Sequence, residues 1–469
     1  MKNKERVLWV ALTAFLIAFS AFAFTTPKLS ALQSGNEVND YLGSFEYLFQ
    51  FLLQNYVDEG PPKQLYEGAL KGMFESLDDP YSYYLTASDM EKMNDTTIGE
   101  FGGVGLYISK PAKSDTADDP YARFVRVVSP IEDTPAYRAG VHAGDYITRI
   151  ESEPVDDLTI DEVVDKLRGK PGTDVTVTLL RSGDIEFEKT LTRAIIEIPT
   201  VKEAMIPGGI GYLRIIQFTP YTDDRVKEAI RFFEKNNYTS LIIDVRGNPG
   251  GLLDTVAKTA DFFLDKGVIV STKSRIKSEN EVFYAKRSIL VPKNIPIAVL
   301  IDKGSASAAE ILSGALKDTG RGVLVGETSF GKGSVQKILP FHDGGVKLTI
   351  AKYYTPSGVN IDKIGIDPNY EVKEEELSDE ETAALGRILK EQLITNFIDT
   401  HPDPTMKQRE DFINKLHQDG IALEDRLLER LIQNEINLMM DKPPVYDLDY
   451  DLALQEAVRL IKTGKIKGQ

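Results

Sequence analysis

The sequence predicts a multidomain α/β protein with helical segments at both ends. Over residues 196–372, apolar strands such as SLIIDVRG and PIAVLIDKG alternate with helical stretches. This alternation is typical of a parallel sheet that helices cover on both faces. Before it, residues 96–195 combine short strands with two helices and end in a hairpin, as in a small separate module. The protein has 469 residues, which is room for two to four domains of roughly 100–200 residues.

Residues 1–24 are expected to lie outside the folded domains. The basic residues Lys2, Lys4 and Arg6 precede a run with few polar residues over positions 7–24. This pattern is that of a secretory signal or of an uncleaved membrane anchor. We therefore expect the remaining residues to act outside the cytoplasm, either secreted, periplasmic or on the cell-envelope side, with a possible anchor at residues 7–24.

An N-terminal helical segment is expected over residues 25–95. The stretch EVNDYLGSFEYLFQFLLQNY places Tyr41, Phe45, Leu48 and Leu52 on one helical stripe. The stretch PPKQLYEGALKGMFESL starts with prolines, which favour the beginning of a second helix. The sequence DDPYSYY then breaks the helical pattern.

The C-terminal region, residues 373–469, turns acidic and then helical. Leu427, Leu428, Leu431 and Ile432 form one apolar stripe, and DLALQEAVRLI forms another. Such stripes pack either against the core of their own molecule or against a partner copy, and the sequence leaves both alternatives open.

Composition excludes several kinds of chemistry. The sequence has no cysteine, so disulfides, thiol catalysis and cysteine-ligated zinc are ruled out. Its four histidines show no metal-ligand spacing, and neither a metal site nor a cofactor is indicated. The net charge of −17 argues against nucleic acid as a partner.

The stretch GETSFGKGS, residues 326–334, is close to a phosphate-binding loop. Such a loop needs Ser or Thr directly after its lysine and a helix behind it. Here Gly333 follows Lys332, and the next residues, SVQKILPF, have the pattern of a strand. A nucleotide site is therefore disfavoured, and Lys332 needs another explanation.

Ser307 lies where an apolar strand passes into a helix. A turn of this kind can present a nucleophile beside the N–H groups of a helix N-terminus. However, Ser307 with Glu310 three residues later is also a capping-box pattern, and Ser305 can cap equally well. Taken alone, this segment favours capping over catalysis.

Three strand ends change that balance. The segments IIDVRGNPGG, IDKGSAS and VGETSFGKG follow strands whose carboxyl ends share one edge of a parallel sheet. Ser307 and Lys332 can therefore meet, with Lys332 as the base if burial lowers its pKa. Backbone N–H groups of Ala308 and of Gly250 or Gly251 can hold an oxyanion. The residue four positions after the lysine, Gln336, can orient it by a hydrogen bond.

These motifs together resemble the C-terminal processing peptidases, or tail-specific proteases, which are Ser-Lys peptidases with an embedded PDZ domain. The resemblance spans about residues 40–370 and includes LIIDVRGNPGGLL, GSASAAEILSGALKD and VGETSFGKGSVQ. It implies a crotonase-like α/β peptidase core over residues 196–372, with Ser307 as nucleophile, Lys332 as general base and Gln336 as the residue that positions the lysine. One departure is Ala309, where the family often has serine at a non-catalytic position.

The resemblance also implies that residues 96–195 form a PDZ domain, which binds the C-termini of polypeptides by strand addition. The expected peptide-binding residues are Gly103, Val104, Gly105, Leu106, Tyr107 and Ile108, from the motif GGVGLYI. Arg168, in LRGKPG, matches a position that links the occupied PDZ domain to the protease core. Relatives also suggest a homodimer formed through terminal helices.

The sequence thus predicts a serine endopeptidase, secreted or membrane-anchored, that acts on proteins or peptides with free C-termini and is gated by its PDZ domain. Two other classes remain as alternatives. One is a catalytically silent PDZ scaffold or binding protein. The other is a nucleotide-binding protein.

Overall fold

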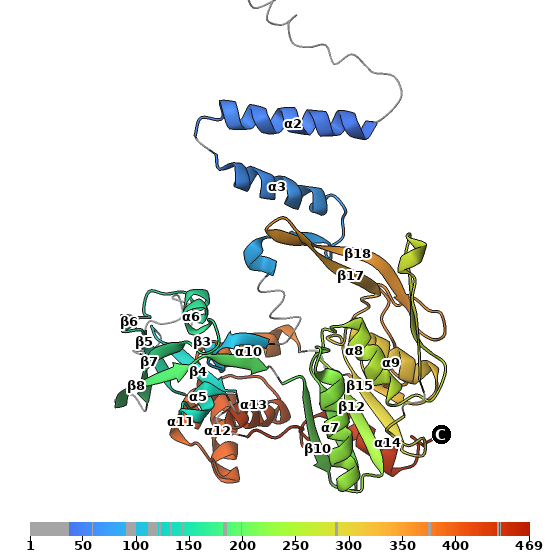
Figure 1. Ribbon diagram of the computed structural model, residues 1–469. Helices are drawn as coiled ribbons and strands as arrows, with labels where there is room; N and C mark the ends of the chain where they lie inside the picture. The colour runs from blue at the N-terminus through green and yellow to red at the C-terminus, as the bar shows by residue number, and fades with distance from the viewer. Residues whose placement is uncertain are drawn as a thin grey trace, which may run out of the picture. The chain divides into compact units, whose positions relative to one another are not determined.

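The computed structural model describes residues 37–58, 60–90, 100–110, 121, 123–131, 134–142, 144–181, 185–197, 199–286, 289–373, 377–438, 440 and 442–469 (Figure 1). The protein divides into two compact units, residues 1–77 and 78–469. The segment expected to be a signal or anchor, residues 1–24, lies outside the described residues. Among the residues that are described, no helix combines the length and the apolar character needed to cross a membrane.

The first unit contains the two helices expected from the sequence, α2 (Glu37–Asn55) and α3 (Pro62–Glu75). Helix α3 starts with proline in its first turn, where the missing N–H costs no hydrogen bond. Helix α2 has no buried residue, and its apolar side chains, including Phe45 and Leu48, are exposed.

The module within residues 100–197 is built on an antiparallel sheet of strand order β3-β4-β5-β7-β8, with β6 paired to β5. Its strands are β3 (Leu106–Ser109), β4 (Val125–Pro130), β5 (Tyr146–Ile150), β6 (Glu153–Pro154), β7 (Asp174–Arg181) and β8 (Ile185–Thr192), and its helices are α5 (Pro135–Arg138) and α6 (Ile160–Leu167). Strands β2 (Glu100–Gly103) and β9 (Ala194–Glu197) pair with each other and bring the two ends of the module together. That pairing suits a domain inserted into a longer polypeptide.

The central sheet of the second unit has the strand order β10-β11-β12-β15-β16-β19. Its strands are β10 (Val201–Ile206), β11 (Ile210–Ile215), β12 (Ser240–Asp244), β15 (Ile297–Ile301), β16 (Val323–Gly326) and β19 (Tyr370–Glu371). All neighbours from β11 to β19 pair in parallel. The apolar runs of β12 and β15 are completely buried, as expected for strands covered on both faces.

Helices cover both faces of this sheet (Figure 1). Helices α7 (Thr222–Lys235), α8 (Leu253–Asp261) and α9 (Ala308–Asp318) share one apolar core with alternate strand residues such as Leu241. The intervening residues, such as Ile242, pack with α14 (Leu452–Lys462) on the other face. Helix α14 therefore covers the second face of the sheet that carries the site.

A second, antiparallel sheet belongs to the same unit, with strand order β1-β18-β13-β14 and β17 also paired to β18. Its members are β1 (Tyr83–Leu85), β13 (Val268–Lys273), β14 (Val282–Tyr284), β17 (Ser334–Phe341) and β18 (Gly344–Tyr354), and a short 3₁₀ turn, η2 (Lys277–Glu279), precedes β14. Strands β17 and β18 form the hairpin predicted around the sequence HDGG.

Helices α10 (Asp379–Lys390), α11 (Leu393–Thr400), α12 (Met406–Gln418) and α13 (Asp425–Leu438) form a cluster with its own apolar core. The α13 residues Leu428, Ile432 and Ile436 are buried inside it. Of the two alternatives for the C-terminal apolar stripes, packing within the same molecule is therefore confirmed for α13 and also for α14.

Candidate active site

Ser307 is the residue that directly precedes helix α9, six residues after the end of β15. Its backbone adopts φ 54° and ψ −112°, a conformation that L-residues other than glycine rarely take up. The neighbouring serine has a different role, because Ser305 is fully buried and its hydroxyl donates to the Val245 carbonyl at 2.8 Å.

Glu310 links the segment around Ser307 to the segment around Lys332. Its carboxylate accepts the Ser307 N–H at 2.8 Å, as the capping-box pattern predicts. The same buried carboxylate also accepts the Lys332 N–H at 2.9 Å, together with the Gly331 N–H at 2.7 Å and the Ser329 hydroxyl at 2.6 Å. The sequence indicates only the capping interaction and gives no sign of this bridge between the two segments.

Lys332 lies in the loop between β16 and β17, close to the backbone of a neighbouring loop. A Cβ added at Gly331 would stand 2.9 Å from the Gly365 nitrogen, and one at Gly333 would stand 2.5 Å from the Asp362 nitrogen. The flanking glycines are therefore needed for close backbone approach. Strand β17 begins at Ser334, so no helix follows the lysine and the phosphate-loop alternative loses its structural requirement.

The environment of Lys332 favours its neutral form. Burial, and then the positive charge of Lys347, hold the pKa of Lys332 below its ordinary value, while Glu310 and Asp79 act in the opposite direction. Its Nζ lies 4.8 Å from the centroid of the Tyr81 ring. Among the described residues, Nζ takes part in no hydrogen bond or ion pair.

Gln336 lies on β17, four residues after Lys332. Its amide nitrogen donates to the Ser334 hydroxyl at 2.9 Å and to the Thr349 hydroxyl at 3.2 Å. In this conformation the amide N–H groups are therefore directed to two hydroxyls of the β17–β18 hairpin.

Two glycines of the NPGG segment lie against the Ser307 turn. Gly250 has φ 104°, and a Cβ there would stand 2.7 Å from the Ser307 Cβ. The Gly250 N–H donates to the Asn248 side-chain oxygen at 2.8 Å. By contrast, the N–H groups of Gly251 and Ala308 have no acceptor within the part of the protein that the structure describes. These two are therefore the N–H groups available to a developing oxyanion.

One cavity of about 350 Å³ brings the expected catalytic groups together. Ser307, Ala308, Lys332, Gln336, Gly250 and Gly251 all line it. Tyr353 and Lys347 line it as well, although no sequence motif points to them. The Tyr353 hydroxyl lies within hydrogen-bonding distance of the Lys332 carbonyl and, at 3.1 Å, of the Ser307 carbonyl. The buried tyrosine is thus a second contact shared by the Ser307 and Lys332 segments.

The segment DDPYSYYL also reaches this site, although the sequence indicated only the end of a helix there. Asp79 accepts the Ser82 hydroxyl at 2.6 Å and the Tyr81 N–H at 3.0 Å. Burial alone would raise the pKa of Asp79, but hydrogen bonds from Ser82 and Thr349, together with the charge of Lys332, lower it overall. Strand β1 then pairs with β18, with Tyr83 opposite Lys347. This pairing holds the segment beside Lys332.

Of the expected peptide-binding residues, Leu106, Tyr107 and Ile108 lie on β3, at one edge of the module's sheet, whereas Gly103 is the last residue of β2. Strand β3 pairs with β4 on one side, and no other described strand pairs with its second edge. Gly105, with φ 81°, precedes β3, where a Cβ would overlap the Thr134 side chain. Leu106 and Ile108 pack against the module core, whereas Tyr107 is exposed. An open edge with alternating side chains is the geometry required for strand addition.

Arg168 follows the last residue of α6 in the same module. Its guanidinium carbon lies 4.9 Å from the centroid of the Phe101 ring on β2. Its backbone N–H donates to the Val164 carbonyl and closes the helix. The guanidinium therefore contacts the strand that leads into the glycine-rich loop.

The fold and the site together define a peptidase core that carries a peptide-binding module. The profile of Peptidase family S41 matches residues 209–372, that of the PDZ domain matches residues 126–181, and that of the activating protease CtpB N-terminal domain matches residues 23–89. The protein belongs to peptidase family S41, and its relatives are carboxy-terminal processing proteases.

The carboxy-terminal-processing protease of Bartonella bacilliformis is 41% identical over 371 residues, which covers 76% of this protein and 82% of the relative. The carboxy-terminal processing protease CtpA of Bacillus subtilis is 32% identical over 371 residues, covering 78% and 77% respectively. A solved photosystem II D1 C-terminal processing protease shares 30% identity, with a TM-score of 0.41 over 71% of this protein and 88% of its own length. The fold class and the family predicted from the sequence are confirmed.

Proposed function

We propose that this S41 peptidase is a serine endopeptidase that acts outside the cytoplasm, captures substrate C-termini with its PDZ domain and hydrolyses peptide bonds through an acyl-enzyme at Ser307. The observation that carries the proposal is the single cavity lined by Ser307 and by Lys332, whose pKa is lowered. A lysine in its neutral form can take the proton from a serine hydroxyl, and a lowered pKa makes that form more accessible.

The proposed reaction uses groups that line this cavity. Ser307 Oγ attacks the scissile carbonyl carbon while its proton passes to Lys332 Nζ, and the carbonyl oxygen becomes an oxyanion. The N–H groups of Ala308 and Gly251 stabilise that oxyanion, since the Gly250 N–H is already donated to Asn248. The Lys332 ammonium then returns the proton to the leaving amine as the C–N bond breaks. Water then attacks the ester carbonyl while Lys332 takes its proton, and the Lys332 ammonium returns that proton to Ser307 Oγ as the acyl–oxygen bond breaks and the acid product leaves.

Gln336 is proposed to position Lys332 for this transfer. In the present conformation its amide nitrogen is bonded to Ser334 and Thr349, and its side-chain oxygen remains the group that can accept from an ammonium. Both side chains line the same cavity. Because a glutamine adds no charge, it can orient Nζ and leave the pKa of Lys332 low.

The PDZ domain is proposed to take the substrate C-terminus along the open edge of β3, with residues 103–105 donating to its carboxylate. Arg168 is proposed to link this binding event to the protease core. Its contact with Phe101 on β2 supports the role, because β2 leads directly to the carboxylate-binding loop.

We also propose that the protein forms a homodimer through its terminal helices and is directed across or anchored to a membrane by residues 7–24. The apolar side chains of α2 support the first part, since Phe45 and Leu48 are exposed. Light scattering on the double variant Phe45→Glu/Leu48→Glu tests the dimer, because this variant is expected to be a monomer. An unchanged mass would exclude α2 as the interface.

The function is tested with purified Ser307→Ala and Lys332→Ala variants. Each should reduce cleavage of a peptide with a free C-terminus by at least about 10⁴-fold while thermal unfolding stays cooperative. Activity retained by either folded variant would exclude the mechanism. A catalytically silent PDZ scaffold, the alternative, predicts peptide binding without cleavage and no Ser307-dependent labelling by a fluorophosphonate.

A further inference from the structure

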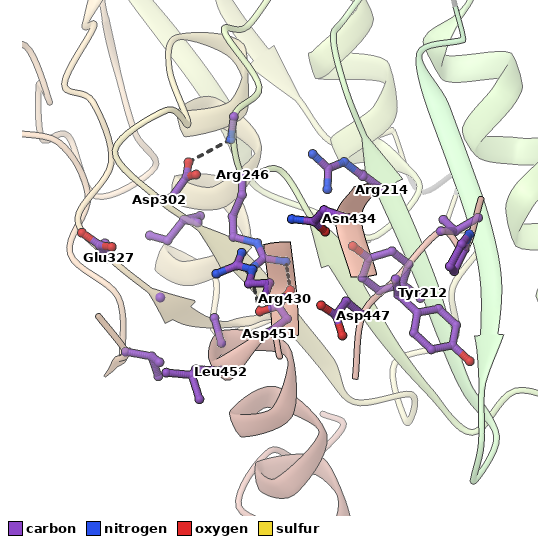
Figure 2. A pocket seen from close by; sticks show the side chains of 18 of the residues that line it. Tyr212, Arg214, Arg246, Asp302, Glu327, Arg430, Asn434, Asp447, Asp451 and Leu452 are labelled. Carbon is purple, nitrogen blue, oxygen red and sulfur yellow. Dashed lines mark hydrogen bonds and ion pairs between the residues drawn. The ribbon is translucent and has the colours of Figure 1, made fainter. Parts of the chain in front are cut away.

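Arg246, just beyond the end of β12, is held between two carboxylates from distant parts of the sequence. Its Nε and Nη2 donate to the two oxygens of Asp244 at 3.0 and 2.6 Å. Its Nη1 and Nη2 donate to the two oxygens of Asp451 at 2.8 and 2.6 Å. Figure 2 shows the Arg246 side chain extending to Asp451, which lies at the start of α14. The two residues are 205 positions apart in the sequence.

This cluster is largely shielded from water, which makes its charge interactions strong. The side-chain exposure is 0% for Asp244, 15% for Asp451 and 20% for Arg246. Bidentate pairs between arginine and carboxylate are both geometrically specific and strong. Arg246 and Asp451 line a cavity of about 510 Å³ (Figure 2).

Arg246 is followed immediately by the segment that reaches Ser307. The Gly247 N–H donates to the Asp302 carboxylate at 2.9 Å. The Ala306 N–H donates to the Asn248 carbonyl at 2.9 Å, and the Asn248 side chain accepts the Gly250 N–H at 2.8 Å. A series of hydrogen bonds therefore connects residues 247–250, which directly follow Arg246, to the turn that carries Ser307.

We propose that Asp451 is a positioning residue for the oxyanion-binding segment, residues 247–251, and acts on it through Arg246. Without Asp451, Arg246 Nη1 loses its carboxylate partner and the guanidinium keeps only its contacts with Asp244. The strand end can then shift, and with it the N–H group that faces the oxyanion. Helix α14 lies outside the matched peptidase region, residues 209–372, yet in this proposal it supports the catalytic geometry. The inference rests on the function proposed above.

The test must separate this role from the second task of Asp451, which is to cap α14. Its side chain accepts the Leu454 N–H at 2.9 Å. Asp451→Ser keeps a capping oxygen but is too short to reach Arg246. Asp451→Asn keeps the cap and one acceptor for Arg246 but removes the charge. The matched control is Glu456→Gln, which removes another carboxylate from α14, one that pairs with Arg459 at 2.6 Å.

The measurements are kcat and KM for a peptide substrate and the inhibition constant of a peptide aldehyde. The aldehyde adds to Ser307 and places an oxyanion where the tetrahedral intermediate has one. We expect Asp451→Ser to lower kcat on the order of 10- to 100-fold with nearly unchanged KM, because a misplaced donor acts on the transition state. Aldehyde binding should weaken by a similar factor. Asp451→Asn should lie between this variant and the wild type, and Glu456→Gln should match the wild type.

Wild-type kcat in a folded Asp451→Ser protein would overturn the proposal, as would a rise in KM alone or an equal loss of activity in Glu456→Gln. If Asp451→Ser does not fold, Asp451→Asn carries the test by the same criteria. Failure of the proposed function itself looks different. In that case the wild type does not cleave, or Ser307→Ala still cleaves.

Discussion

The Nζ atom of Lys332 lies over the Tyr81 ring, 4.8 Å from the ring centroid. An aromatic face stabilises a cation, whereas burial and Lys347 favour the neutral amine. The proposed base is thus subject to opposing influences from the segments of Tyr81 and Lys347. Its protonation can be shifted in either direction by single substitutions that leave Lys332 in place.

Lys347→Met should move the activity profile to higher pH. Removing the Lys347 charge takes away one of the causes that depress the pKa of Lys332, so its pKa rises. Only the neutral amine can accept the Ser307 proton, so the acidic limb of kcat/KM against pH should shift upward. Lys337→Met, on the exposed side of the same hairpin, is the control for net charge and should leave the limb unchanged. An unshifted limb in Lys347→Met would contradict the assignment.

Asp79→Asn should move the same limb to lower pH. The Asp79 carboxylate favours the charged form of Lys332, so its removal lowers the pKa of the lysine further. Asparagine keeps an acceptor for the Ser82 hydroxyl, which limits structural change. A shift in the same direction as Lys347→Met would show that both variants act by disturbing the structure and not by charge.

Gly250→Ala should abolish activity by closing the space beside the nucleophile. The new Cβ would stand 2.7 Å from the Ser307 Cβ and 2.9 Å from the Ala306 carbonyl oxygen. We expect kcat to fall on the order of 100-fold or more, as when an oxyanion donor is lost. Gly358→Ala is the matched control, because it has φ 82° and no atom within 4 Å of its Cβ. That control should lose only about 1–2 kcal/mol of unfolding free energy, from left-handed strain, and keep full activity.

Arg168→Ala should reduce stimulation of the peptidase by PDZ-binding peptides while peptide affinity persists. The control is Arg123→Ala, because Arg123 also lies over an aromatic ring of the module, Phe124, at 4.8 Å. Peptide affinity is measured by fluorescence anisotropy, and stimulation by the ratio of kcat with and without the peptide. Equal stimulation in Arg168→Ala and the wild type would remove Arg168 from the coupling.

The core of this fold is readable from the sequence because its strands are buried on both faces. Runs such as SLIID and IAVLI need no partner information to be recognised, and their carboxyl ends must share one edge. That rule is why Ser307, Gly250 and Lys332 are expected to meet, and they line one cavity. The family resemblance predicts which of these residues is the nucleophile and which is the base, because the spacing alone leaves those roles open.

Other features depend on contacts that no local pattern encodes. Helix α14 shows an apolar stripe in the sequence, but nothing there says that it covers the second face of the sheet. The pairing of Arg246 with Asp451 joins positions far apart in the sequence. The segment that holds Asp79 indicates only a helix end, because its relation to Lys332 arises from the pairing of β1 with β18. The capping pattern at Glu310 gives no indication that its carboxylate also accepts the N–H groups of Gly331 and Lys332.

The backbone conformation of Ser307 is strained, so keeping a side chain at this position lowers the stability of the fold. At φ 54° a side chain of any kind is strained, so Ser307→Ala removes the hydroxyl and keeps the strain, whereas Ser307→Gly removes both. Differential scanning calorimetry should find the glycine variant about 1 kcal/mol more stable than the alanine variant, and equal stability would mean that the turn is not strained. Selection for thermostability alone would therefore favour replacing the residue that is proposed to be the nucleophile. The glycine variant would also be the more robust bait for retaining uncleaved substrates.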